Sequence, residues 1–94
     1  MTVYVDPLMR HGWVLHGRAV ASCHMYADDV VELHSMAARI GMKLEWFQEH
    51  ERLPHYDLTP SRRALAVANG AVEQTRREIV RFMRERSLAR GASR

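Results

Sequence analysis

The fold is organised around one stretch of sequence, Leu53-Pro54-His55-Tyr56-Asp57-Leu58-Thr59-Pro60-Ser61-Arg62-Arg63. We expect a loop that ends at Thr59, because a threonine followed by a proline is typical of a helix N-cap and a first helical residue. Two arginines in the first turn would lie at the positive end of the helix dipole, which is unfavourable unless an anion is near. The stretch therefore predicts an anionic partner at this helix start, either Asp57 or a bound ligand.

The same stretch predicts a ligand pocket. The first backbone N–H groups of a helix have no partner within the helix and commonly bind phosphate. We expect Arg63 to contact the ligand more closely than Arg62, because its helical angle places it beside the buried side of the helix. Two alternatives are an internal ion pair between Asp57 and Arg63 and a polar loop held by an Asx turn. The predicted ligand-binding residues are His55, Tyr56, Asp57, Arg62 and Arg63.

Outside this stretch, strands alternate with helices. A β-branched and aromatic segment at residues 2–5 predicts a strand, and His16-Gly17-Arg18 predicts a hairpin turn after it. Helices are expected from an Asp28 cap to Ile40, from Pro60 to Asn69 and from a Thr75–Glu78 capping box onward, and further strands at Lys43–Gln48 and Ala71–Glu73. This order predicts an α/β domain over residues 1–88, with a small partly parallel sheet, an N-terminal hairpin and three flanking helices. Residues 89–94 are expected to form a loose basic tail.

Length and composition limit the classes of protein to which the chain can belong. The chain has 94 residues, of which 47% are hydrophobic and 27% charged, as in one soluble globular domain. It lacks an apolar run of about 18 residues and a secretory leader, so we expect no membrane partner. Cys23 is the only cysteine, which excludes an internal disulfide, suits a reducing cytoplasm and is typical of a small buried side chain. We also expect Trp46 and Phe47 in the core rather than in a base-stacking surface.

Several motifs resemble a known family when they are taken in order along the chain. They are Thr2-Val3-Tyr4-Val5-Asp6, Ser22-Cys23-His24-Met25-Tyr26-Ala27-Asp28, Glu32-Leu33-His34, Ile40-Gly41, Trp46-Phe47-Gln48, His55-Tyr56-Asp57-Leu58, Arg63-Ala64-Leu65-Ala66 and Gly70-Ala71-Val72. Over residues 2–73 the chain is similar to the bacterial and phage family catalogued as domain of unknown function 4031. The resemblance implies a bacterial or phage cytoplasmic protein and carries no reaction or ligand. The helix after Gln74 lies outside the motifs.

Histidines and carboxylates in unusual positions predict a metal site. His24 ends a predicted strand, His34 lies at the edge of the apolar side of a predicted helix, and His55 lies in the central loop. We expect them to meet Asp6 or Asp57 near the carboxyl ends of the strands, where open α/β sheets bind ligands. Imidazole and carboxylate groups suit a divalent transition metal, and they also suit acid–base chemistry near neutral pH. The predicted metal ligands are Asp6, His24, His34 and His55; for His24 and His34 the alternative is a histidine satisfied within the fold.

Two functional hypotheses follow from these residues. In the first, the pocket binds a phosphate-bearing small ligand such as a nucleotide, and a metal assists its hydrolysis; no motif decides whether a reaction occurs. In the second, the C-terminal helix binds nucleic acid or an acidic protein, because residues 76–94 carry seven arginines and two glutamates in a chain of net charge +3. The predicted contacts are Arg76, Arg77, Arg81, Arg84 and Arg86. A solvated helix face, or contact between two copies in a homo-oligomer, would explain the same arginines.

Overall fold

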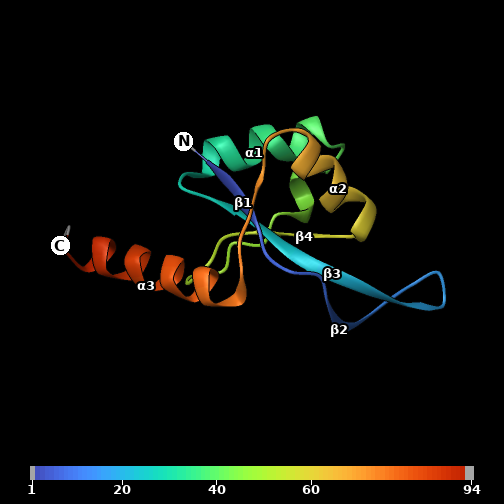
Figure 1. Ribbon diagram of the computed structural model, residues 1–94. Coiled ribbons are helices and arrows are strands. Elements are labelled where there is room, and N and C mark those ends of the chain that lie inside the picture. Colours follow the sequence, from blue (N-terminus) through green and yellow to red (C-terminus); the bar gives the residue numbers. More distant parts are fainter. Residues whose placement is uncertain (1, 93–94) are drawn as a thin grey trace.

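A computed structural model describes residues 2–92, which form a mixed sheet of five strands with three α-helices (Figure 1). The strands are β1 (Val3–Val5), β2 (Met9–Leu15), β3 (Arg18–Ala27), β4 (Tyr56–Leu58) and β5 (Val72–Glu73). The helices are α1 (Val30–Arg39), α2 (Pro60–Ala68) and α3 (Arg76–Ala92), and a short 3-10 helix, η1, spans Leu44–Trp46. The predicted α/β class is confirmed, with its N-terminal hairpin and partly parallel sheet.

The long strand β3 is the centre of the sheet. β1 and β2 pair with successive parts of one edge of β3, and β4 pairs with its other edge. Met25 shows this arrangement, since it lies opposite both Val5 of β1 and Tyr56 of β4. These pairs are antiparallel, whereas β5 runs parallel to β1. The β2–β3 turn has positive φ at His16 and Gly17, the backbone that a two-residue hairpin turn requires.

Each face of the sheet has its own apolar cluster. The larger cluster joins β1, β3 and β4 to α1 and α2 through side chains such as Val5, Met25 and Leu33. The smaller cluster includes Tyr26 and Ile79, and it joins the sheet to α3. Figure 1 shows α3 on the side of the sheet away from α1 and α2. Successive residues of a strand point to opposite faces. The polar residues that alternate with the larger cluster along β3 and β4 therefore lie on the face away from α1 and α2.

Local capping signals define two of the helix starts as predicted. Thr59 caps α2 by accepting a hydrogen bond from the Arg62 N–H, with Pro60 as the first helical residue. Thr75 and Glu78 cap α3 reciprocally, each accepting a hydrogen bond from the backbone N–H of the other. The expected Asp28 cap of α1 is wrong. Asp29 caps α1, and Asp28 accepts hydrogen bonds from the Thr2 N–H and the Tyr4 hydroxyl.

Two segments between α1 and α2 differ from the prediction. The strand expected at Lys43–Gln48 is wrong, because Trp46 and Phe47 donate backbone hydrogen bonds to residues three positions earlier and form η1. The expected loop contains β4, whose buried Tyr56 and Leu58 alternate with half-buried Asp57. Tertiary pairing with β3 thus makes a strand where the local sequence, rich in proline and polar groups, favours a loop.

α3 ends at Ala92, so the first four residues of the expected loose tail are helical, while residues 93–94 lie outside the described part of the chain. Within residues 2–92, no helix combines the length and the apolar character needed to cross a membrane.

Candidate functional site

Three side chains meet on the sheet face that α1 and α2 leave uncovered. One donor atom each from His24, His55 and Asp57 lies within 4.8 Å of the others, and we call these residues the His-Asp cluster. The two imidazole rings are 4.8 Å apart at 81°, and His55 Nε2 lies 3.4 Å from Asp57 Oδ1. His24 pairs directly with Asp57 across β3 and β4, and His55 shares its face because it is two residues from Asp57.

Hydrogen bonds fix the orientation of both rings. His24 Nδ1 donates to Asp6 Oδ2 at 2.9 Å, and Asp6 Oδ1 accepts the His24 backbone N–H at 2.6 Å. His55 Nδ1 donates to the Leu53 carbonyl oxygen at 2.7 Å. A histidine that binds metal usually donates its other ring N–H to a carboxylate or carbonyl in this way. Nε2 is therefore the nitrogen that each ring would use to bind a metal.

The charges of the cluster suit a cation. The hydrogen bond with His55 holds the pKa of Asp57 below its usual value, despite partial burial, and Gln48 also donates to this carboxylate. Asp57 is therefore an anion near neutral pH. The pKa of His24 is raised, chiefly by its hydrogen bond to Asp6 and against the effect of burial, so at acidic pH a proton would compete with a metal for this ring. Two imidazoles and one carboxylate are a recognised ligand set for divalent transition metals.

The separations in the cluster are close to those of one coordinated ion. Donors at about 2.1 Å from a tetrahedral ion lie about 3.4 Å from one another. The His55–Asp57 separation of 3.4 Å already has this value. The 4.8 Å limit on the other separations leaves roughly 1.4 Å to be closed, which a small rotation of side chains about χ can supply.

The cluster differs in membership from the predicted metal ligands. His24 and His55 lie together, and the third member is Asp57, the alternative to Asp6 as the carboxylate and also a predicted residue of the ligand pocket. Asp6 lies outside the cluster and orients His24. His34 lies on the other side of β4, where its Nδ1 is 2.7 Å from the buried Tyr56 hydroxyl and its ring packs against Phe47.

Two adjoining cavities open beside the cluster. The smaller is lined by Gly12, Trp13, Ser22, Gln48 and the three cluster residues. The larger has a volume of about 730 Å³, and we call it the aromatic cavity. It is lined by Trp13, Leu15, His16, Met42, Glu45, Trp46, Phe47, Gln48, Asp57, Thr59 and Arg62. Trp13, Gln48 and Asp57 line both cavities, so a ligand in the aromatic cavity could reach the His-Asp cluster.

The two arginines at the start of α2 have different surroundings. Arg62 lines the aromatic cavity, and its Nη1 donates to the Ile40 carbonyl oxygen at 2.6 Å. Arg63 turns into the fold, where Nε donates to the Asp6 carbonyl oxygen and Nη1 pairs with Glu73, both at 3.0 Å. The arginine expected to contact the ligand is thus engaged within the fold, and its neighbour lines the cavity. Tyr56 is fully buried.

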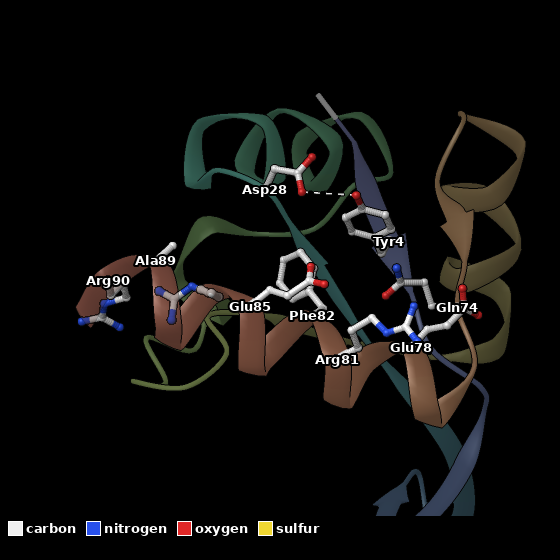
Figure 2. Close-up of a pocket in the computed structure, with 10 residues that line it drawn as sticks. Tyr4, Asp28, Gln74, Glu78, Arg81, Phe82, Glu85, Ala89 and Arg90 are labelled. Carbon is white, nitrogen blue, oxygen red and sulfur yellow. Dashed lines mark hydrogen bonds between the residues drawn. The ribbon is translucent and has the colours of Figure 1, made fainter. Parts of the chain in front are cut away.

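The arginines of α3 are also divided between internal contacts and exposure. Arg86 and Arg90 donate to backbone carbonyl oxygens of the loop before β4, and the Arg76 Nη1 lies 2.9 Å from the Met9 sulfur. A further cavity of about 790 Å³ lies beside α3. Figure 2 shows its lining, which includes Arg81 and Glu85 of α3 together with Tyr4 and Asp28. Exposed Arg77, Arg81 and Arg84 follow one another at spacings of four and three residues, which places them on one helical stripe.

Sequence reasoning missed the pairing of His24 with Asp57 and the exposure of Trp46. The alternation His55-Tyr56-Asp57, with a buried residue between two polar ones, is the signal that could have revealed a strand with a polar face. The register that sets His24 opposite Asp57 has no local signal, because it joins residues far apart in the chain.

Comparison with known proteins identifies the family of the chain. No curated protein and no solved structure matches the chain. The family model described as "Protein of unknown function (DUF4031)" matches residues 3–86, which include Asp6, the His-Asp cluster, the aromatic cavity and the first part of α3. Since the match covers most of the 94 residues, the chain belongs to the DUF4031 family of proteins of unknown function.

Proposed function

We propose that the protein binds a divalent transition metal at His24, His55 and Asp57 and uses it to bind and hydrolyse a phosphate-bearing small ligand. The observation that carries this proposal is the convergence of two imidazoles and a carboxylate within 4.8 Å, with Nδ1 of both rings bonded to an acceptor. Such second contacts set the ring orientation that metal binding needs.

The chemistry of the donors supports both metal binding and a reaction. Three protein ligands leave coordination positions for water and for a ligand, as in catalytic rather than structural metal sites. A bound divalent metal would polarise a phosphoryl oxygen and lower the pKa of water. The chain itself would orient the ligand, because Asp57 lies between the cluster and the aromatic cavity.

Arg62 supports the choice of an anionic ligand. A guanidinium group carries five N–H donors, so its one bond to the Ile40 carbonyl leaves donors for a phosphate. Arg62 lines the same cavity as Asp57, so a ligand held by a metal at the cluster would find a second cation in that cavity. Thr59 caps the same helix start, so the side chain of Arg62 replaces the backbone N–H groups as the expected phosphate contact.

Metal content tests the site directly. Purified protein, stripped with a chelator and dialysed against Mn²⁺, Fe²⁺, Co²⁺ or Zn²⁺, should retain about one ion per chain. His24→Asn and His55→Asn remove Nε2 but keep a donor for Asp6 or for the Leu53 carbonyl, and both should lose the ion. His50→Gln is the matched control, because His50 is exposed and its ring lies 6.3 Å from that of His55, outside the cluster. Equal metal content in all four proteins would refute the site.

A chromogenic substrate tests the reaction. Metal-loaded protein should release nitrophenol from p-nitrophenyl phosphate or its diester, and Asp57→Asn should abolish the release while the fold remains intact. Metal binding without turnover on either ester would reduce the proposal to ligand binding. Turnover that survives both Asp57→Asn and a chelator would exclude this site as the source.

The exposed stripe of Arg77, Arg81 and Arg84 favours a second candidate function, binding of nucleic acid by α3. Arg76 and Arg86 have internal contacts and would contribute less. Duplex DNA should then bind at about 50 mM salt, weaken steeply as salt increases, and fail to bind when the three exposed arginines are replaced by glutamate. Absence of binding at low salt would exclude this function.

A further inference from the structure

We propose that the phosphate-bearing ligand is a nucleotide whose base stacks on Trp46 in the aromatic cavity. This inference rests on the proposed function, since it names the ligand class of the same site. It starts from an unexpected position: Trp46, which the sequence places in the core, is 44% exposed and belongs to neither apolar cluster. An exposed indole in the wall of a cavity is a stacking surface for a flat ring.

The neighbouring side chains show that Trp46 differs from the other aromatic residues of this region. Phe47 also lines the cavity, but its ring contacts His34 and Tyr56, and it packs against the larger apolar cluster. Trp46 carries the Lys43 Nζ 5.5 Å from its ring centroid, a cation–π contact. Trp13 adds a second indole from β2 to the same cavity.

The charges that line the two cavities indicate how the bound ligand is oriented. Asp57 belongs to the His-Asp cluster, where the phosphate is proposed to bind, and it lines both cavities, so the phosphate end of the ligand lies toward Asp57. Glu45 lines only the aromatic cavity and is adjacent to Trp46 in η1. Its carboxylate would repel a phosphate and accept N–H groups of a base. A cavity of about 730 Å³ is also within the range of small-ligand pockets.

Tryptophan fluorescence can report on this cavity, because Trp13 and Trp46 are the only two tryptophans of the chain and both line it. Protein loaded with Zn²⁺, a diamagnetic ion, is titrated with AMP, GMP, CMP and UMP, with the four nucleosides, and with ribose 5-phosphate. We expect nucleotides to bind more tightly than ribose 5-phosphate. Because stacking on one aromatic side chain is lost, Trp46→Leu should lower the affinity for nucleotides about 5- to 150-fold and leave the affinity for ribose 5-phosphate unchanged.

Two further variants control for structure. Trp46→Phe keeps an aromatic ring and should restore most of the affinity, with Trp13 as the remaining reporter. Leu44→Ala changes another exposed apolar residue of η1 that does not line the cavity, so it should bind as the wild type does. Loss of nucleotide affinity in Leu44→Ala equal to that in Trp46→Leu would overturn the stacking inference.

The panel separates failure of this inference from failure of the proposed function. If nucleotides and ribose 5-phosphate bind equally well, and Trp46→Leu does not change their affinities, the inference that the ligand is a nucleotide is overturned and the phosphate site stands. Nucleosides that bind as tightly as nucleotides, and that lose affinity in Trp46→Leu, would uphold the base contact and overturn the phosphate site. Absence of binding by every probe to Zn²⁺-loaded protein would overturn both.

Discussion

Replacing Asp6 with asparagine should weaken the proposed metal binding, although Asp6 is not a member of the His-Asp cluster. The Asp6 carboxylate accepts both the backbone N–H and the ring Nδ1–H of His24. Asparagine has one oxygen and one NH₂ group. If the oxygen keeps the backbone N–H, the NH₂ group faces Nδ1, which must then accept a hydrogen bond. The ring proton moves to Nε2, the atom that would bind the metal.

The size of the effect follows from this change of tautomer. Losing the second contact of a metal-binding histidine typically costs 10- to 100-fold in affinity, or about 1.4–2.7 kcal/mol. The fold should persist, because Arg63 holds Asp6 through its backbone carbonyl oxygen, which the substitution keeps. We therefore expect a folded protein with a tenfold to hundredfold weaker metal site.

Competition with a chromophoric Zn²⁺ chelator measures the affinity, and thermal unfolding followed by circular dichroism verifies the fold. Asp28→Asn is a matched control, because Asp28 also accepts one backbone N–H and one side-chain donor, but from Thr2 and Tyr4. Unchanged Zn²⁺ affinity in Asp6→Asn would refute the reasoning. An equal loss in Asp28→Asn would attribute the effect to general destabilisation instead.

Three further predictions concern stability. Thr59→Ala should lower the free energy of unfolding by about 0.5–2 kcal/mol, and Thr59→Ser should not, because the hydroxyl caps α2; denaturant titration compares them. Gly41→Ala should cost at least about 1 kcal/mol by the same assay, since φ is +79° and the added Cβ would lie 2.8 Å from the Arg62 Nη1. The pKa of His24 is raised in the folded protein above its ordinary value of 6.5. Protonation of His24 therefore stabilises the metal-free protein below pH 6.5, and this stabilisation is lost as the pH rises through the pKa of the folded state. The stability difference between wild type and His24→Asn should therefore shrink toward alkaline pH, and a difference that grows would contradict the assignment.

The parts of the fold that were predictable are those with local causes. The Thr59-Pro60 and Thr75–Glu78 capping signals and the hairpin at His16-Gly17 act within a few residues, and each forms as expected. The strand predicted at Lys43–Gln48 does not form, because alternating apolar residues favour a strand only where a partner strand is available. The strand β4 instead takes the edge of β3.

The candidate site was predictable in its residue types and only partly in its membership. His24 and His55 were selected because they occupy unusual positions, and they meet. His34 was selected for the same reason, but helix α1 points it toward Tyr56 and the core. Asp57 joins the cluster through the β3–β4 register, which depends on the whole tertiary structure and not on the spacing of residues in the sequence.

The contacts of α3 have a consequence for the entropy of ligand binding. Arg86 and Arg90 donate to the carbonyl oxygen of Glu51, two residues before the Leu53 carbonyl that orients His55. A surface loop left to itself would sample many conformations on the nanosecond to microsecond scale, and ordering it upon binding would reduce affinity. Here the contacts of α3 order the loop when the protein folds, so the orientation of His55 is already set before a ligand binds. Arg86, which the sequence assigned to nucleic-acid binding, and its neighbour Arg90 thereby hold in place the loop that carries the proposed metal ligand His55.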